Sequence, residues 1–210
     1  MTEALDLTRT RDMLMLAGEA IVASRDRLTK ADQEIGDGDH GVGMARGFRA
    51  FCEALEKKPA DSLDQLLRSG AMAILSSSGG ASGVIFGSFF QGAAKAVSGD
   101  RLDAAGFAAA LRGGLESVVA RGKAKVGDKT VVDALAPAAE AAEKAAAAGG
   151  DLGAVAAAAA SAAEAGAERT KGFKATTGKA KALGDRSIGY VDPGALSMSL
   201  LLRAMAAAVH

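Results

Sequence analysis

Apolar residues at helical spacing constrain the fold of this chain more than any other feature. In the first such stretch Met13, Leu16, Ala20 and Ala23 recur every three or four positions and so share one helix face. No stretch of any length reads as a strand. We therefore expect an all-α protein of about eight helices. The expected helices are 8–28, 43–58, 63 to a loop at 76–83, that loop to about 97, 104–121, 130–148, 152–168, and 193 to a frayed end at His210.

Candidate caps stand at most of these helix starts, because Ser, Thr and Asp side chains accept hydrogen bonds from the free N–H groups of a first turn. Pro137 is expected to disturb the middle of its helix. The stretch 152–168 is rich in Ala, which is the best helix former and lets neighbouring helices approach closely. The candidate caps are Thr8 or Thr10, Ser62, Asp103, Asp151, and Asp192 with Pro193 in the first helical position.

Composition narrows the class of protein. The 210 residues are 49% hydrophobic but only 4% aromatic, which is typical of closely packed helices, and the length suits one domain over residues 1–210. The net charge is zero and no basic block occurs, which argues against nucleic acid or an anionic membrane as partner. No apolar run reaches about 18 residues and no signal-peptide pattern opens the chain. Cys52 fits a helix core, so a reducing cytoplasm is the expected location.

The connections between the expected helices alternate between short and long. If consecutive helices run up and down, every second connection lies at the same end of the bundle. The connections at 57–61, 98–101 and 149–151 are short and plain. The others are longer and hold the unusual residues of the chain, so we expect them to form an active face at one end of a helical barrel. These four are at 32–41, 76–83, 122–130 and 170–191.

Three carboxylates stand within eight residues at Asp32, Asp37 and Asp39, and Gly36 and Gly38 alternate with them. Carboxylates this close repel one another unless a cation lies between them. Oxygen ligands alone suit Mg²⁺ or Ca²⁺ better than zinc. Because glycine adopts positive φ at little steric cost, a short loop can turn its acids inward. The pattern predicts a metal that carries phosphates.

Other interpretations of this stretch fit less well. Asp-Gly pairs are ordinary turn residues, and most such clusters are solvated loops. An EF-hand fails because Phe48 stands where its bidentate Glu would be, counted from Asp37. Gly36, Gly38 and Gly41 match the dinucleotide fingerprint, but no strand precedes them and bare carboxylates repel a pyrophosphate.

The other long connections offer groups that an anionic phosphate would use. The Ser/Gly loop at 76–83 leads into a helix N-terminus, where free N–H groups attract anions, although by itself it could be an ordinary linker. Gly122-Lys123 and Gly178-Lys179 are not followed by Ser or Thr, so no Walker A motif exists. Lys179 and Arg186 could neutralise phosphate or be solvated.

Two further groups have simpler explanations when each is taken alone. Asp192 could only cap its helix, and Lys129 and Asp133 are four apart, so they could form an intrahelical pair. On one face, however, the four loops together fit a metal–nucleotide site better than any one of them alone.

Four motifs occur in order along nearly the whole chain. They are Asp32-x-x-x-x-Asp37-Gly-Asp39-His-Gly, Gly79-Gly-Ala-Ser-Gly83, Gly127-Asp-Lys-Thr130 with Asp133, and Gly184-Asp-Arg-Ser with Asp192-Pro-Gly-Ala195. Together they resemble the nucleotide-binding L subunits of dihydroxyacetone kinases, the DhaL-type domain. The resemblance implies an eight-helix antiparallel up-and-down barrel that binds ADP or ATP across one end through two Mg²⁺ ions.

The resemblance also implies roles for individual residues. Asp32, Asp37 and Asp39 would be the metal ligands. No catalytic residue is expected on this chain, because the group that activates the acceptor would belong to a partner. The nucleotide contacts would be His40, Gly41, Val42, Gly43, Ala81, Ser82, Gly122, Val131, Lys179, Asp192, Pro193 and Gly194.

Three positions depart from the family pattern. Gly43 stands where Asn is common, which removes one side-chain hydrogen bond. Lys179 replaces Arg, which keeps the charge but loses the planar bidentate fork. Tyr190 replaces His. These departures bear on nucleotide affinity and on the acceptor, whereas the metal ligands are unchanged.

The implied activity is phosphoryl transfer to dihydroxyacetone or a similar small ketose, which a separate K subunit holds covalently on a histidine. ADP would either stay as a fixed cofactor, recharged by a phosphohistidine carrier of the sugar phosphotransferase system (an M subunit), or ATP would exchange at each turnover. The alternatives are a four-carbon ketose such as erythrulose, a fatty-acid acceptor, which the lack of a further domain weakens, and a non-catalytic regulatory binding module.

Overall fold

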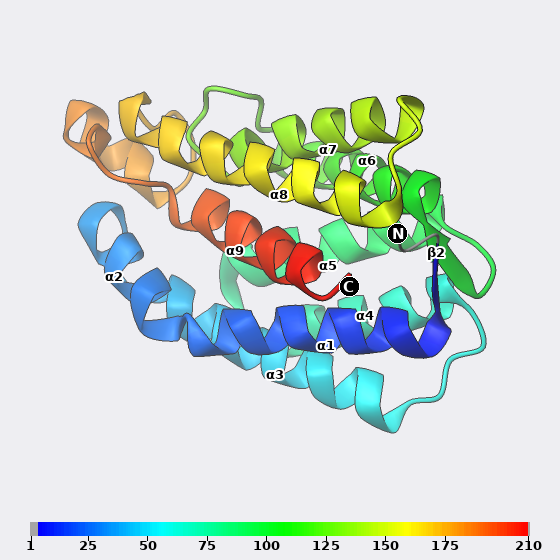
Figure 1. Cartoon of the computed structure of the whole chain (residues 1–210). Helices are drawn as coiled ribbons and strands as arrows, with labels where there is room; N and C mark the ends of the chain where they lie inside the picture. Colours follow the sequence, from blue (N-terminus) through cyan, green and yellow to red (C-terminus); the bar gives the residue numbers. More distant parts are fainter. Residues whose placement is uncertain (1–3, 210) are drawn as a thin grey trace.

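Eight helices form a closed ring in the computed structural model, which describes residues 4–209 (Figure 1). Each helix packs against the next along the chain, and α9 returns to pack against α1. The expected all-α up-and-down barrel is therefore confirmed. His210 lies outside the described residues. The ring consists of α1 (Leu7–Ala23), α3 (His40–Lys57), α4 (Leu63–Ser77), α5 (Gly80–Ala96), α6 (Ala104–Gly122), α7 (Val132–Ala147), α8 (Leu152–Arg169) and α9 (Pro193–Ala207).

An additional helix, α2 (Arg25–Ile35), extends beyond the ring next to α1. The single helix expected over 8–28 is wrong, because the chain breaks at Ser24, where φ is −85° and ψ is 6°. At the end of α1 the Ser24 N–H donates to the carbonyls of Ala20 and Ile21. The Ser24 carbonyl accepts the Leu28 N–H of α2. As a consequence Asp32 is held on a helix rather than in a loop.

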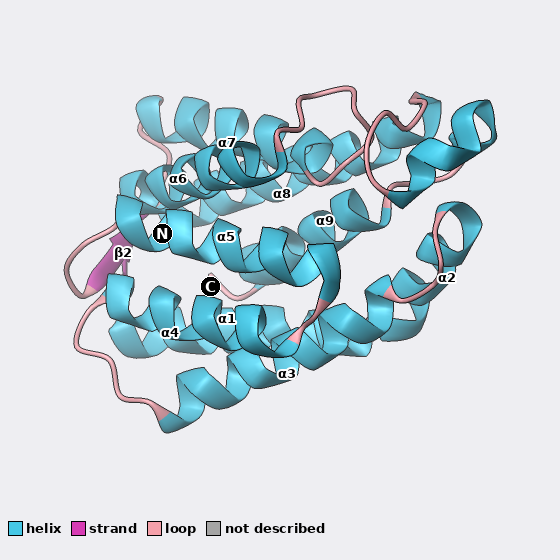
Figure 2. Cartoon of the chain, turned by 180° about the vertical axis from the view of Figure 1, so that it is seen from behind, coloured by secondary structure: helices cyan, strands magenta, loops and turns pink. Residues whose placement is uncertain are grey.

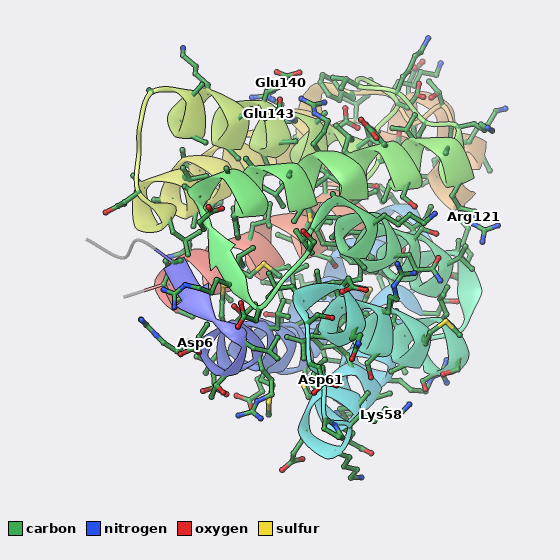
Figure 3. All side chains as sticks on the ribbon, turned by 90° about the vertical axis from the view of Figure 1, so that its right-hand side faces the viewer. Asp6, Lys58, Asp61, Arg121, Glu140 and Glu143 are labelled. Atoms are coloured by element: carbon green, nitrogen blue, oxygen red, sulfur yellow. The ribbon has the colours of Figure 1, made fainter. Side chains whose placement is uncertain are left out.

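Two three-residue strands lie at the end of the barrel away from α2, where no strand was expected. β1 (Ala4–Asp6) pairs antiparallel with β2 (Arg101–Asp103) through the register Leu5 to Leu102. A ladder of three residues is too short to produce an alternating sequence pattern. Figure 3 looks onto this end and shows Asp6 at the strands.

The predicted helix caps are partly confirmed. Asp103, Asp151 and Asp192 each accept an N–H from the first turn of their helices. At α1 the cap is Asp6, which accepts the Arg9 N–H at 2.8 Å, so the expectation of Thr8 or Thr10 is wrong. Ser62 occupies the cap position of α4, but its hydroxyl donates to Asp64 at 2.6 Å instead.

The expected sixth helix also differs in detail. α7 begins at Val132 rather than Thr130, and it continues through Pro137 without a break. Pro137 has no N–H to donate to the Asp133 carbonyl one turn earlier. At that carbonyl Gly166 of α8 comes so close that a Cβ there would lie 2.2 Å from the oxygen.

The core combines a small aromatic cluster with many alanines. The Phe48 ring lies 5.5 Å from Phe51 and 6.1 Å from both Phe86 and Phe90, measured between ring centroids. These rings fill the side of the barrel formed by α3 and α5, which Figure 2 shows from behind. Such aromatic pairs stabilise by about 0.5–1.5 kcal/mol beyond their buried area. On the other side the buried residues of α7 and α8 are mostly Ala.

The long connection from α8 to α9 contains two 3₁₀ helices, η1 (Thr170–Gly172) and η2 (Lys179–Ser187).

Cys52 is half-buried, and burial raises the pKa of its thiol to about 11. Within residues 4–209, no helix has both the length and the apolar character needed to cross a bilayer. The cytoplasmic location remains a prediction.

A close approach between ring helices joins α5 and α6. A Cβ on Gly92 would lie 2.2 Å from the Gly113 carbonyl oxygen, and a Cβ on Gly113 would lie 2.7 Å from that of Gly92. Backbone atoms cannot yield as a flexible side chain can. We therefore expect Gly92→Ala to force the two helices apart and to lower the free energy of unfolding by about 1–3 kcal/mol, measured by urea denaturation.

Gly153→Ala is the matched control, because a Cβ there meets nothing closer than the Asp151 carboxylate at 3.5 Å. Ala is the better helix former, so this variant should be unchanged or more stable by up to about 1 kcal/mol. Equal stability of Gly92→Ala and the wild type would contradict the close packing of α5 on α6.

Candidate functional site

A pocket of about 800 Å³ opens at the end of the barrel where the four longer connections meet. Its wall includes residues from the turn before α3, from the start of α5, from the α6–α7 connection and from the segment before α9. The prediction that every second connection converges on one face is therefore confirmed. The short connections lie at the other end, where Figure 3 labels Lys58 and Asp61.

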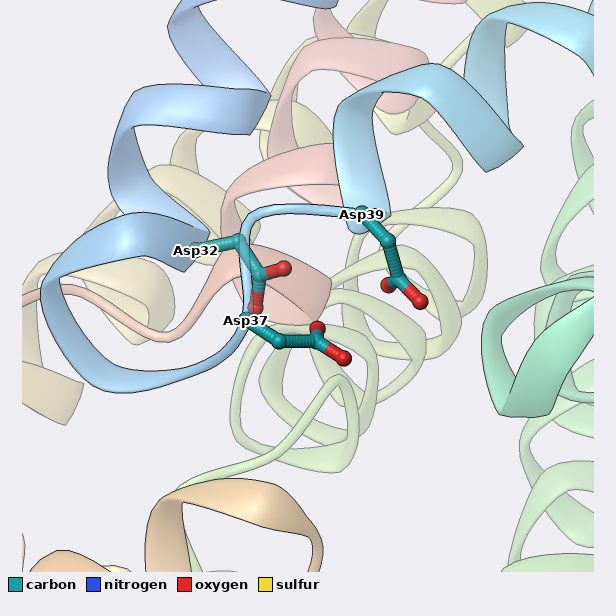
Figure 4. Close-up of side chains that lie close together, drawn as sticks. All are labelled: Asp32, Asp37 and Asp39. Atoms are coloured by element: carbon teal, nitrogen blue, oxygen red, sulfur yellow. The ribbon is translucent and has the colours of Figure 1, made fainter.

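Three carboxylates converge at one edge of this pocket (Figure 4). Asp32 projects from α2, Asp37 lies in the turn and Asp39 immediately precedes α3; one oxygen from each lies within 4.8 Å of the others. Asp32 is buried, whereas Asp37 and Asp39 are exposed. The turn needs Gly36, since a Cβ there would meet the Asp32 carboxylate at 2.3 Å. Because all the donors are hard oxygens, the set fits Mg²⁺.

Lys179 provides a positive charge beside the acids. Its Nζ donates to the carboxylates of Asp37 and Asp39, the latter at 3.0 Å. The hydrogen bond from Lys179 lowers the pKa of Asp37, and the same contacts raise the pKa of Lys179. The ammonium thus offsets part of the repulsion among the carboxylates, and it also attaches η2 to the acidic turn.

The N-terminus of α5 differs from the other helix N-termini at this end. The first N–H of α3 donates to Asp32, that of α7 donates to the Thr130 hydroxyl, and Asp192 caps α9, whereas α5 has no side-chain cap hydrogen bond among the described residues. The start of α5, with the positive end of its helix dipole, therefore favours an anion such as phosphate. At α5 the approach is made by Gly79 and Gly80, with φ of 72° and 64°. Ala81 and Ser82 follow and line the pocket.

His40 lines the pocket but is almost fully buried. Its Nδ1 is 2.8 Å from the Ser82 hydroxyl and its Nε2 is 2.7 Å from the Ser197 hydroxyl. The backbone N–H of His40 donates to Asp32 at 3.1 Å, which links the first metal candidate to α3. Burial lowers the pKa of His40 against the opposing effect of Asp32 and Asp39.

Lys129 is a buried lysine that joins two distant segments. Its Nζ donates to the Thr170 carbonyl at 2.6 Å and to the Tyr190 carbonyl, and burial lowers its pKa. The alternative of an intrahelical pair with Asp133 is wrong, because Lys129 precedes α7 and has a φ of 62°. Asp133 instead accepts the N–H groups of Gly127 and Thr130, at 2.6 and 2.7 Å.

Asp192 caps α9 through the Ala195 N–H at 2.7 Å and also lines the pocket. Burial raises the pKa of Asp192 to about 7, an effect that the Lys129 ammonium opposes. Pro193 and Gly194 continue the same wall. The cap and the pocket position are thus combined in one residue.

The inner wall of the pocket is apolar, which sequence reasoning missed. Ile85 and Phe86 of α5, Val118 of α6 and Val132 of α7 lie there beside the predicted Val131. Such residues look like ordinary core positions in the sequence, since helical spacing does not show which of them border a cavity. An apolar wall beside free helix N-termini suits a flat base attached to phosphates.

All but one of the predicted site residues line this pocket. The exception is Gly41, where a Cβ would meet the Arg25 carbonyl at 2.2 Å and Thr29 at 2.3 Å, so it serves the packing of α3 on α2. Their roles as ligands remain predictions. The predicted residues that line the pocket are Asp32, Asp37, Asp39, His40, Val42, Gly43, Ala81, Ser82, Gly122, Val131, Lys179, Asp192, Pro193 and Gly194.

Comparison with known proteins gives matches over nearly the whole chain. The profile of the DAK2 domain matches residues 34–207. The "PEP-dependent dihydroxyacetone kinase 1, ADP-binding subunit DhaL" of Listeria innocua is 40% identical over 189 residues, which cover 90% of this chain and 89% of that protein. The corresponding ADP-binding subunit DhaL of Escherichia coli is 37% identical over 207 residues, which cover 97% and 99%.

A solved structure has the same fold. The dihydroxyacetone kinase from C. freundii in complex with AMP-PNP and Mg²⁺ matches with a TM-score of 0.72 and 27% identity. The match covers 94% of this chain but only 33% of that chain, so this protein corresponds to about a third of the larger kinase.

We expect Asp37→Asn to remove one anionic ligand and to weaken Mg²⁺ binding by about 100-fold or more, measured by isothermal titration calorimetry with and without ADP. Asp61→Asn, an exposed acid at the opposite end (Figure 3), is the control and should bind Mg²⁺ like the wild type. Unchanged Mg²⁺ affinity of the Asp37 variant would refute the metal assignment.

Lys179→Ala should have opposite effects on two ligands. Without nucleotide the ammonium competes with a cation for Asp37 and Asp39, so its removal should tighten Mg²⁺ binding by up to about fivefold. Binding of Mg-ADP should instead weaken, because a positive charge next to the phosphates is lost. Lys181→Ala, on the same 3₁₀ helix, should change neither affinity. Parallel changes in both affinities would contradict this assignment.

Proposed function

The chain belongs to the DAK2 domain family, and we propose that it is the ADP-binding L subunit of a dihydroxyacetone kinase. One observation carries the proposal: three convergent carboxylates, the uncapped N-terminus of α5 and an apolar wall share one pocket. A nucleoside diphosphate with Mg²⁺ has these three chemical parts in the same order. The names and the coverage of the DhaL relatives support the same conclusion.

The residues of this chain would bind and orient the reactants. Asp32, Asp37 and Asp39 would hold the metal, for which we propose two Mg²⁺ ions, while the start of α5 and Lys179 would hold the phosphates. Bound Mg²⁺ would neutralise charge that develops on the transferred phosphoryl group. The apolar wall would take the base and keep water away from one side of the nucleotide.

A partner would supply the activated acceptor. Among the described residues that line the pocket, His40 is the only histidine, and both of its ring nitrogens contact serine hydroxyls. It is therefore poorly placed to remove a proton from a substrate. We propose that a separate K subunit holds dihydroxyacetone on its own histidine and docks over the pocket mouth.

We propose that ADP stays bound as a fixed cofactor and is recharged by a phosphohistidine carrier of the phosphotransferase system. The DhaL relatives are named as ADP-binding subunits of PEP-dependent kinases, which supports this mode over exchange of ATP at each turnover. A four-carbon ketose is the alternative acceptor, because the acceptor contacts would lie on the partner. A regulatory role without catalysis is the second alternative.

Denaturing extensively dialysed protein and identifying the released nucleotide by chromatography tests the proposal directly. We expect about one ADP per chain, retained because phosphates, metal and base are all held in one pocket. Protein without nucleotide that binds Mg-ATP on addition would instead indicate exchange.

Asp37→Asn should lose the retained ADP, whereas Asp61→Asn should keep it. Neither retention nor binding by the wild-type protein would overturn the nucleotide assignment. A carboxylate variant that still engages a partner protein would favour the regulatory alternative.

A further inference from the structure

Besides His40, three basic side chains line the pocket in the part of the chain that the structure describes: Arg46, Lys129 and Lys179. Two of them already have strong partners. Lys129 donates to two backbone carbonyls, and Lys179 donates to two carboxylates. Arg46 donates to one backbone carbonyl and has no carboxylate partner within residues 4–209. Its charge is therefore the one at the pocket that the protein leaves without a counter-charge.

Arg46 stands on the face of α3 that borders the pocket. Asp39, Gly43 and Arg46 are separated by four and three residues, so they share one side of the helix, and all three line the pocket. From Asp39 to Arg46 the helix advances by about 10 Å, at about 1.5 Å per residue. This wall thus has the cluster of carboxylates at one end and a guanidinium at the other.

The guanidinium lies against the turn that opens α5. One of its terminal nitrogens donates to the Ser78 carbonyl, and a Cβ on Gly79 would lie 2.8 Å from the same nitrogen. These contacts place the positive charge of Arg46 beside the uncapped N-terminus of α5. A guanidinium has several N–H donors in a fixed fork, so donors remain for a ligand after the bond to Ser78.

The turn before α5 has an anchor of its own in Ser78, which is only 1% exposed. The Ser78 hydroxyl donates to the Gly43 carbonyl at 2.9 Å. A Cβ on Gly47 would lie 2.7 Å from the Ser78 Cβ, and a Cβ on Gly83 would lie 2.6 Å from it. Because α3 and α5 enclose Ser78 this closely, a purely structural role for Arg46 would duplicate an existing contact.

We propose that Arg46 binds a phosphate of the nucleotide at the start of α5, about two helical turns along α3 from Asp39. This inference rests on the proposed function, because it needs a nucleotide in the pocket. A metal at the carboxylates neutralises the phosphate oxygens next to it. Oxygens further along α3 keep their charge, and the planar fork of Arg46 can bind two of them at once.

Arg46→Ala should weaken the binding of Mg-ADP by about 10-fold to 100-fold, which is the worth of a hydrogen bond between charged groups. The measurement is isothermal titration calorimetry on protein freed of nucleotide. Arg49→Ala is the matched control, since Arg49 is a second exposed arginine of α3 and does not line the pocket. This variant should bind Mg-ADP like the wild type.

The dependence on salt reports whether the lost interaction is one of charge. Raising the salt concentration from about 50 to about 300 mM should weaken the binding of Mg-ADP to the wild type and to Arg49→Ala. The same change should weaken binding to Arg46→Ala less, because one charge–charge interaction is already absent. A merely structural role of Arg46 would leave the salt dependence as it is in the wild type.

Arg46→Gln separates the phosphate from the turn. Its amide can still donate to the Ser78 carbonyl but has no charge. Arg46→Gln should therefore lose affinity and salt dependence as Arg46→Ala does, while its free energy of unfolding, measured by urea denaturation, should equal that of the wild type. This variant keeps the test decisive if Arg46→Ala fails to fold.

Four results would overturn the inference: unchanged affinity of Arg46→Ala, wild-type affinity of Arg46→Gln, a salt dependence that neither variant alters, or an equal loss in Arg49→Ala. Wild-type affinity of Arg46→Gln would assign Arg46 to the turn alone. In each of these cases the wild type still binds Mg-ADP, so the proposed function stands. If the wild type binds no Mg-ADP, the proposed function fails and the inference fails with it.

Discussion

Repulsion among Asp32, Asp37 and Asp39 is the constraint on which the pocket end of this protein depends. The three carboxylates stay together because positive groups surround them: the Lys179 ammonium donates to two of them, and the His40 N–H donates to the third. The same groups that balance the acids also fix the local structure. Lys179 holds η2 over the turn, and the His40 contact fixes the start of α3 against α2. The same hydrogen bonds thus balance the charge of the carboxylates and fix the positions of the segments around them.

Because of the up-and-down arrangement, the helix dipoles of alternate helices add up at one end of the barrel. Since neighbours alternate in direction, the positive N-terminal ends of α3, α5, α7 and α9 all face the pocket. At the other end the N-termini of α1, α6 and α8 are closed by the side chains of Asp6, Asp103 and Asp151. Among the described residues α4 is the one helix at that end without a side-chain cap, whereas at the pocket end the start of α5 is left uncapped and can bind an anion.

The features of the fold that depend on local residue patterns and on the alternating direction of consecutive helices could be predicted from the sequence. Helical spacing predicts the ring, and alternate connections predict which loops meet. The pair of short strands, the break at Ser24 and the contacts of Lys129 were missed because they depend on which segments tertiary packing brings together. The apolar wall was missed for a related reason, since Phe86 and Val118 look like core residues until the loops leave a space beside them. The contact of Ser197 with the site could not be predicted from the sequence, because its partner His40 lies 157 positions away.

These dependences make the site a product of ring closure. Its residues come from four connections, and Lys129 holds both ends of the last of them, the α8–α9 connection, by donating to the Thr170 and Tyr190 carbonyls. A buried ammonium is costly unless it is hydrogen-bonded, so breaking either of the two Lys129 contacts is unfavourable. The segment before α9 is thereby held where Asp192 can cap α9 and line the pocket at once. A ligand that contacts all four connections would stabilise the closed ring, because it would bind the folded chain and not the unfolded one.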